Sequence, residues 1–370
     1  MRTRIVLSLL ACLTLSSVCA VRLGAQTEVI DFPLKGNRSV HVPFDYSEMI
    51  ESVRYIRIED SAILGDVIDV KLVGDKFYLW DRSQQAIIVV DMSGRILSQV
   101  ARQGRANNEY LSINAYDVHP GTGEIHIYDW LGSRIQVYSG DGRFLRSVPL
   151  ETRFISARDM AVTSQGTYLL FKPDYGKRFR GLVELGADGK ERRMLVHMDN
   201  RFRLHSWLVP PFYFGRLSDG STTMMGHIDK NQFYRYAPDG IFSVPYQLKL
   251  GITIPKDLRE KEYPEREDAL ADNYNTAFRY QETDHWFIVA EQYQLHVKFC
   301  FYDKVHKIPH VVAGPKDIVD PFHTGLLYFW RGSGSYLYAL LDDESSPAYK
   351  QGAKSVGEGT NPIIFLAKTR

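Results

Sequence analysis

Three aspartates occupy equivalent positions in consecutive segments of the chain, and their side chains are the best suited to hold a cation. Asp69, Asp117 and Asp159 stand in the short runs "IDV", "YDV" and "RDM". Hard cations such as Ca²⁺ take several oxygen ligands, many of them from carboxylates. If the three side chains converge, they would form a metal site, with Ca²⁺ as the expected ion.

The same repetition has a second interpretation. A buried carboxylate needs hydrogen-bond partners, and an aspartate repeated at one position of a repeating unit can accept them from the backbone of its own or the next unit. The sequence leaves the metal role and this architectural role open.

Aromatic residues gather in and beside two long insertions, 197–216 and 254–284. Aromatic rings supply large contact areas at binding surfaces, and they also fill protein cores. These rings therefore either contact a ligand, such as a glycan, a peptide or an envelope protein, or cap the core. The candidate ligand contacts are Trp207, Tyr213, Phe214, Tyr274, Tyr280 and Trp286, together with His205.

None of the motifs that identify common catalytic sites occurs in the sequence. There is no His-Glu-x-x-His pair, phosphate-binding loop or dinucleotide fingerprint. The run "GSGSY" (332–336) resembles the G-x-S-x-G nucleophile elbow but has Tyr336 where a glycine is required, so we interpret it as a turn between strands. The sequence therefore assigns no catalytic residue.

An internal repeat indicates the elements that position these residues. Residues 76–100 align without a gap with residues 124–148, at an offset of 48 residues. Each copy has an apolar run that ends in an aspartate (Asp81 or Asp129), which we expect to organise the polar loop that follows, and then a second apolar run and a tight turn with glycine. This pattern predicts antiparallel strands joined by hairpins. With the preceding aspartate-containing run, each unit has four strands, the size of one β-propeller blade.

Weaker copies continue to the end of the chain and bring the number of units to six. We therefore expect an all-β fold, a six-bladed β-propeller of four-stranded antiparallel blades with loop and short-helix insertions, formed by residues 26–370 as a single domain. The last unit lacks its outer strand. One of two N-terminal runs, "VIDFPL" (29–34) or "SVRYIRIE" (52–59), is expected to supply that strand and close the ring.

The first 25 residues have the pattern of a secretory signal peptide, since the positive start "MRTR" precedes a run of apolar and small residues. Cleavage fits after Ala20 or after Ala25. A lipid anchor at Cys12, in "LLAC", is the alternative. Conventional cleavage leaves Cys300 as the one cysteine, so no internal disulfide is expected, and its strand-like surroundings predict a buried side chain.

The composition is that of a globular protein and argues against one class of partner. Apolar residues make up 44% of the chain, and 45 basic residues stand against 44 acidic ones, for a net charge of +1. This balance gives no electrostatic reason to expect nucleic-acid binding. We expect no transmembrane segment in the chain after the signal peptide.

These motifs resemble those of a family of exported six-bladed β-propellers from Gram-negative bacteria, related to NHL-repeat propellers. The similarity rests on "FYLWDRSQQAIIVVDMSGR" (77–95), "RQGRANNEY" (102–110) and "NPIIFLAK" (361–368). The resemblance implies export to the periplasm or the cell surface, and it implies no particular activity.

The loop in the second of these motifs shares Gly104, Glu109 and Tyr110 with the family pattern "GrGPGEY", while an alanine and two asparagines replace the glycines and proline of that pattern. Asparagine tolerates the left-handed backbone region better than most residues, so the turn can survive this change. We interpret the loop, including Arg102 and Arg105, as a joint between blades rather than as a binding loop.

Two functions are compatible with these features. The first is a non-catalytic binding protein that presents its loops and aromatic insertions to a glycan, peptide or envelope protein. The second is a metal-dependent hydrolase or lyase, similar to lactonases, with Asp69, Asp117, Asp159 and His205 at the axial channel. Bound metal or a deep polar channel would favour the second function, and a shallow aromatic surface would favour the first.

Overall fold

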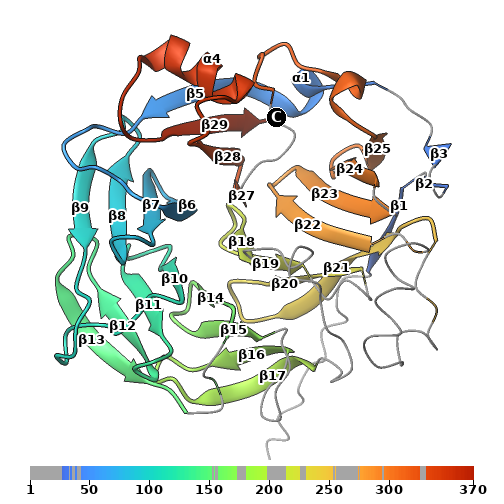
Figure 1. The fold of residues 1–370 in the computed structure, drawn as a ribbon. Helices are drawn as coiled ribbons and strands as arrows, with labels where there is room; N and C mark the ends of the chain where they lie inside the picture. The colour runs from blue at the N-terminus through green and yellow to red at the C-terminus, as the bar shows by residue number, and fades with distance from the viewer. Residues whose placement is uncertain are drawn as a thin grey trace, which may run out of the picture.

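The computed structural model describes residues 27–32, 34–35, 38–39, 43–151, 154, 157–172, 181–197, 214–225, 231–252, 255, 274, 276–293, 296–325 and 331–370. The predicted signal peptide and Cys12 lie outside these residues. Within them, β-strands dominate and are arranged around a central axis (Figure 1). No helix in this part of the chain is long and apolar enough to cross a membrane.

Four separate sheets of four antiparallel strands are present among the described residues. In each sheet the first strand lies nearest the axis and the fourth lies at the rim (Figure 1). The strands of these sheets are β6 (Val67–Val73), β7 (Lys76–Asp81), β8 (Ala86–Asp91) and β9 (Ile96–Val100); β10 (Ala115–Val118), β11 (Ile125–Asp129), β12 (Arg134–Tyr138) and β13 (Phe144–Pro149); β14 (Asp159–Val162), β15 (Tyr168–Lys172), β16 (Gly181–Leu185) and β17 (Glu191–His197); and β22 (Thr276–Glu282), β23 (Trp286–Tyr293), β24 (His296–Asp303) and β25 (Ile308–Val312).

The other long strands form one nine-stranded sheet. Its order is β1 (Glu28–Asp31), β21 (Phe242–Lys249), β20 (Gln232–Tyr236), β19 (Thr222–Met225), β18 (Phe214–Arg216), β27 (Arg331–Ser333), β28 (Tyr336–Leu341), β29 (Ile363–Thr369) and β5 (Ile50–Arg57). The antiparallel strands β18 to β21 meet the antiparallel strands β27, β28, β29 and β5 through a parallel pair, Arg216 with Ser333.

The predicted all-β, propeller-like arrangement of four-stranded antiparallel blades is confirmed. The predicted number of six blades is not confirmed, because the described strands form four separate blades and this one larger sheet. The larger sheet arises where β18 and β27 approach closely enough near the axis to share a backbone pair.

Short elements lie in the connections between these strands. Strand β4 pairs in parallel with β26, and β2 pairs with β3. The bounds of the short elements are β2 (Leu34–Lys35), β3 (Arg38–Ser39), β4 (Phe44–Asp45), α1 (Tyr46–Met49), η2 (Pro315–Asp317), β26 (Ile318–Val319) and α4 (Pro347–Val356).

An N-terminal strand completes the last unit, as the sequence predicts. Strand β5, from the "SVRYIRIE" run, pairs antiparallel with β29 in a register that sets Ile56 opposite Ile364. The other candidate run supplies β1, which instead pairs in parallel with β21. Both runs are short and contain the β-branched and aromatic residues that favour strands, so their composition alone does not decide which sheet edge each one joins.

Glycines in the tight turns meet two requirements at once. Gly94 and Gly142 have φ angles of +93° and +85°, a region that other residues rarely adopt. A Cβ atom on Gly94 would lie 1.8 Å from the carbonyl oxygen of Arg57, and one on Gly142 would lie 2.9 Å from that of Gln99. Arg57 and Gln99 belong to β5 and β9, so each turn packs closely against the outermost strand of a neighbouring sheet.

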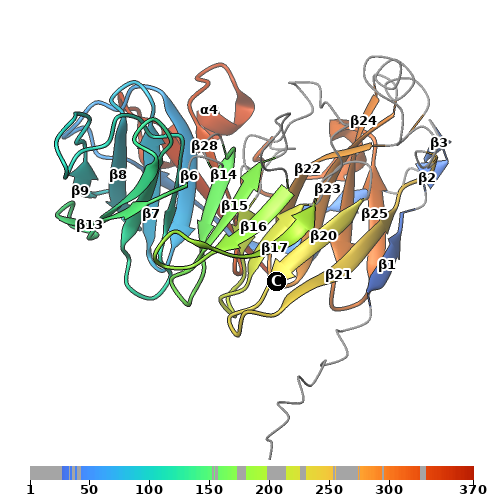
Figure 2. The same cartoon turned by 90° about the horizontal axis from the view of Figure 1, so that it is seen from below.

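The connections divide between two faces of the ring because the strands of a blade alternate in direction. One face, here called the turn face, carries the turns from first to second and from third to fourth strand, such as 74–75 and 92–95 in the first blade. The opposite face, here called the loop face, carries connections such as 101–114 and helix α4 (Figure 2). Helix α4 begins after Ser346, whose hydroxyl accepts a hydrogen bond from the Tyr349 N–H (3.1 Å).

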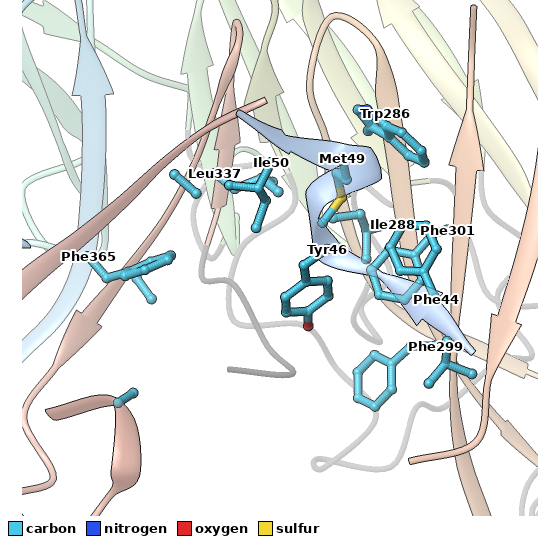
Figure 3. Packing of buried hydrophobic residues seen from close by; sticks show 14 of the residues in the cluster. Phe44, Tyr46, Met49, Ile50, Trp286, Ile288, Phe299, Phe301, Leu337 and Phe365 are labelled. Atoms are coloured by element: carbon cyan, nitrogen blue, oxygen red, sulfur yellow. The ribbon is translucent and has the colours of Figure 1, made fainter. Parts of the chain in front are cut away.

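Apolar side chains fill the space between adjacent sheets. Figure 3 shows one such cluster, in which Phe44 from β4 packs among residues of β23 and β24. The Phe44 ring stacks on Phe301 with 4.5 Å between the ring centroids, and it meets Trp286 edge-on at 5.9 Å. Cys300 is fully buried, as predicted, and burial raises the pKa of its thiol well above the usual value.

Candidate functional site

The three predicted aspartates lie close to the axis, on the innermost strands of three consecutive blades. Asp69 is in β6, Asp117 in β10 and Asp159 in β14, and all three side chains are buried. Their partners decide between the metal role and the architectural role.

Asp69 forms a two-point ion pair with Arg331 of β27. The Nε and Nη2 atoms of Arg331 donate to the two carboxylate oxygens at 2.8 and 2.9 Å, and its Nη1 donates to the carbonyl oxygen of Phe214 at 2.7 Å. Burial raises the pKa of Asp69, and the Arg331 guanidinium opposes that rise. The pair joins β6 to β27, strands that lie far apart in the sequence.

Asp117 has two cationic partners and a backbone donor. Lys71 Nζ lies 3.3 Å from one carboxylate oxygen, while Arg216 Nη2 (2.8 Å) and the Val162 N–H (2.7 Å) donate to the other. Burial alone would raise the pKa of Asp117, but Lys71, Arg216 and the backbone N–H donors together lower it. Because Lys71 also donates to the carbonyl oxygen of Tyr116, the first and second blades are tied together here.

Asp159 accepts hydrogen bonds from two backbone groups. One oxygen accepts from the Met160 N–H at 2.8 Å, and the other accepts from the Phe214 N–H of β18 at 3.2 Å. The three carboxylates thus bind cations and backbone donors, largely from neighbouring sheets. No group of three or more His, Cys, Asp or Glu side chains among the described residues is arranged to hold a metal ion. The geometry favours the architectural role for these aspartates.

A small cavity, here called the axial pocket, lies beside this network. Its volume is about 30 Å³, which is room for a few water molecules at most. It occupies the ends of the inner strands nearest the turn face, since Val73, Arg216 and Ser333 are the last residues of β6, β18 and β27. The polar side chains that line it are Lys71, Asp117, Arg216, Arg331, Ser333 and Tyr338.

Two donors of the axial pocket keep unused hydrogen-bonding capacity. The buried Nη1 of Arg216 has no partner among the described residues. The hydroxyl oxygen of Tyr338 accepts from the Leu72 N–H at 3.1 Å, which leaves the hydroxyl hydrogen free to donate. Burial raises the pKa of Tyr338, so this hydroxyl stays protonated at neutral pH.

The aspartates that end the second strands organise the adjacent loops, as the repeat predicts. Asp81 accepts from the N–H groups of Gly65 (2.6 Å) and Gln84 (3.0 Å). Asp129 accepts from those of Leu111 (3.0 Å) and Gly132 (3.0 Å). Each carboxylate therefore fastens the loop that enters its own blade to the loop that follows its own strand.

The 102–110 loop is held by hydrogen bonds within itself and to the blades on either side of it. The Tyr110 hydroxyl accepts from the Arg102 N–H at 3.1 Å and donates to the carbonyl oxygen of Gln85, while the Glu109 carboxylate accepts from the Ala106 N–H at 2.8 Å. A Cβ atom at Gly104 would lie 2.0 Å from that carboxylate, so a larger residue here would have to displace the Glu109 side chain. The second blade also holds the loop, since Arg134 and Gln136 donate to the Glu109 carbonyl oxygen. Arg105 is exposed.

The predicted aromatic contacts separate into different environments. Trp286 is 3% exposed and belongs to the core cluster of Figure 3. Phe214 is buried and lines the axial pocket, and Tyr280 packs on Phe233 at 4.9 Å while its hydroxyl donates to Glu282. Tyr274 is half-buried. The remaining candidates lie outside the described residues: Trp207, Tyr213 and His205.

The cations of the site are the residues that sequence reasoning missed. Lys71 follows Asp69 at a spacing of two, which puts both side chains on one face of a strand. Arg216 and Arg331 stand beside glycines in the short runs "FGR" and "RGS". The first of these signals is readable in the sequence, whereas the pairing of β18 with β27 is a long-range contact that no local pattern indicates.

The sequence also gave no reason to single out His126. It is 1% exposed, its Nδ1 lies 3.2 Å from the Tyr168 hydroxyl, and its Nε2 lies 3.5 Å from Glu124, which in turn pairs with Arg146. Burial, with the positive charge of Arg146, lowers the pKa of His126 to about 3. The imidazole is therefore neutral at physiological pH.

Together, the fold and the site define an all-β propeller with a cation-rich axial pocket. The chain belongs to the family described as a domain of unknown function, DUF4934, whose model matches residues 27–368. A search of curated proteins found no match.

Solved structures of low sequence identity share the fold. A protein of Bacteroides fragilis NCTC 9343, whose description proposes that it is exported, is 15% identical with a TM-score of 0.71, and the match covers 93% of this chain and 100% of that one. A member of the DUF4221 family from Bacteroides vulgatus ATCC 8482 is 11% identical with a TM-score of 0.53, covering 87% and 98% of the two chains. At these identities the likeness concerns the fold alone.

Proposed function

We propose that this protein is an exported, non-catalytic binding propeller of the bacterial envelope that recognises its ligand at the axial pocket. The ligand is a small molecule, or one group of a larger glycan, peptide or envelope protein. We further propose that residues 1–25 form a signal peptide and that residues 26–370 form one domain.

The observation that carries the proposal is the state of the polar groups around the axial pocket. Metal-assisted or general-base catalysis needs carboxylates or imidazoles that are free to bind a metal or take a proton. Here Asp69 and Asp117 are engaged by Arg331, Lys71 and Arg216. The unused capacity belongs to donors, and such donors can fix the orientation of a ligand.

We also propose that the ring has six blades, and two observations support this number. The two antiparallel halves of the nine-stranded sheet meet in a parallel pair near the axis, so each half can be counted as a blade. Gly94, in the first separate blade, packs on Arg57 of β5, the edge strand of the nine-stranded sheet. Such a contact between the first blade and the sheet that contains the last strands is expected in a closed ring. A closed ring leaves no free sheet edge between blades.

Export is supported by two independent features. The N-terminal sequence has the charge and hydropathy pattern of a signal peptide. The structurally similar Bacteroides fragilis protein carries a description that proposes export. Fractionation of cells producing the full chain tests this part: we expect the protein in the periplasm or at the surface, shortened at its N-terminus.

The binding proposal is tested by a thermal-shift screen of residues 26–370 against oligosaccharides, peptides and organic acids, run beside an ester and lactone hydrolysis screen. We expect at least one compound to raise the melting temperature of the wild type and not that of the Arg216→Met variant. Turnover of an ester or lactone that depends on Asp117 would overturn the non-catalytic proposal.

A further inference from the structure

We propose that the axial pocket is a site for a small oxyanion, the carboxylate, phosphate or sulfate group of a ligand. This inference rests on the proposed binding function and names the chemical group that the site recognises.

The first reason is the unpartnered guanidinium nitrogen of Arg216. Its Nη2 is used twice, toward Asp117 at 2.8 Å and the Val162 carbonyl oxygen at 2.9 Å, whereas its buried Nη1 has no partner among the described residues. A buried charged donor left without an acceptor is costly, and an oxyanion supplies the strongest acceptor. The two engaged contacts hold the guanidinium in place beside the pocket.

The second reason is a further donor from another strand. Tyr338 of β28 lines the same pocket, and the Leu72 N–H already occupies its hydroxyl oxygen as an acceptor. Its hydroxyl hydrogen is therefore left to donate. Arg216 of β18 and Tyr338 of β28 both line the cavity and both carry an unused donor, a combination that suits a group that only accepts hydrogen bonds.

The third reason is the arrangement of charge. Lys71, Arg216 and Arg331 line the pocket, and Asp117 is the one carboxylate among its lining residues. Asp69 lies behind Arg331, with both of its oxygens held by that guanidinium. The lining therefore carries more positive than negative side chains, which favours an anion over a cation, although the donors of Arg331 and Lys71 are already engaged by protein acceptors.

The size of the pocket limits what can enter. A volume of about 30 Å³ accepts a few atoms, such as a carboxylate or one part of a phosphate or sulfate group, but not a sugar ring. The rest of a larger ligand would extend toward the turn face, where the lining strands end. Carboxylate and phosphate sources share the same acceptor chemistry, so they are compared directly in the test.

The test is isothermal titration of residues 26–370 with sodium phosphate, sulfate and acetate, with chloride at matched ionic strength as the reference anion. The variants are Arg216→Lys, which keeps one positive charge but loses the forked donor, and Tyr338→Phe, which loses the hydroxyl. Arg193→Lys is the matched control, because Arg193 pairs with Glu184 on the third blade, outside the pocket. Melting curves establish that each variant is folded.

We expect at least one of the three oxyanions to bind and to bind about tenfold or more weakly to Arg216→Lys, which corresponds to the loss of a charge-assisted hydrogen bond. Tyr338→Phe is expected to weaken binding less, and Arg193→Lys to leave it unchanged. Heats no larger than those of chloride, or equal binding by Arg216→Lys, would overturn the oxyanion site. A neutral ligand whose binding still depends on Arg216 would then leave the proposed function standing.

Discussion

Asp69 and Arg331 lie 262 residues apart in the sequence and form a buried two-point ion pair at the axis of the ring. The pair ties the first strand of the first separate blade to the innermost strand of the last unit. Together with β5 on β29, it links the beginning of the repeat to its end.

Removing Asp69 should therefore be costly. Asp69→Asn leaves the Arg331 charge buried without its partner, and we expect the free energy of unfolding to fall by about 3–5 kcal/mol. Asp66→Asn is the control, because the Asp66–Arg82 pair is solvent-exposed and should contribute less than about 1 kcal/mol. Urea unfolding of both variants measures the difference, and similar losses in the two would contradict the structural role of the Asp69 pair.

A metal chelator should not destabilise the protein. The oxygens of Asp69 and Asp117 are already engaged by arginine, lysine and backbone donors, so EDTA is expected to leave the melting temperature of protein purified without chelator unchanged. Metal analysis of the same sample by mass spectrometry is the companion measurement. A stoichiometric divalent ion that is lost in Asp117→Ala would restore the calcium hypothesis.

His126 should make stability depend on pH. Its pKa in the folded protein is about 3, against 6.5 for an ordinary histidine, so the unfolded chain binds one more proton between these values. The free energy of unfolding should then fall by about 1.4 kcal/mol for each pH unit below 6.5, and this contribution is constant above 6.5. The groups around the ring are Glu124, Arg146, His119 and Asp117, with the Tyr168 hydroxyl at 3.2 Å.

The variant His126→Gln should flatten this pH dependence, as measured by urea unfolding from pH 4 to pH 8. His306→Gln serves as the control, because His306 is exposed in the turn between β24 and β25. An identical slope in the wild type and His126→Gln would refute the assignment.

The joint role of the 102–110 loop predicts a loss of stability without a loss of ligand binding. Tyr110→Phe removes the hydroxyl that bonds to Arg102, Gln85 and Val100, and we expect a destabilisation of about 1–3 kcal/mol with unchanged anion affinity. Tyr336→Phe is the control, because the Tyr336 hydroxyl forms no hydrogen bond with the described residues. A weaker anion affinity in Tyr110→Phe would mean that the loop reaches the ligand.

The sequence predicted the blade pattern well because that pattern is local. The aspartates at 81 and 129 and the turn glycines at 94 and 142 recur at fixed spacing, and the structure uses each pair in the same way. The sequence does not indicate which N-terminal run joins which sheet edge, since the pairings of β1 with β21 and of β5 with β29 are long-range contacts that the composition of neither run specifies.

The sequence predicted the acidic residues of the site but not the basic residues that pair with them. The acidic residues repeat from blade to blade, so the alignment reveals Asp69 and Asp117. The cations that engage them do not repeat: Lys71 comes from the same strand as Asp69, while Arg216 and Arg331 come from distant units. When the sequence does not reveal the cation that pairs with a repeated carboxylate, that carboxylate resembles a metal ligand. This is why the sequence suggested a calcium site.

The most direct test of the account is a paired titration of residues 26–370 with phosphate, sulfate or acetate and with Ca²⁺, in the wild type and in Arg216→Lys. We predict that an oxyanion binds, that Arg216→Lys weakens this binding about tenfold or more, and that Ca²⁺ gives no heat of binding above its heat of dilution. Stoichiometric Ca²⁺ binding that is lost in Asp117→Asn, with no oxyanion binding, would contradict it.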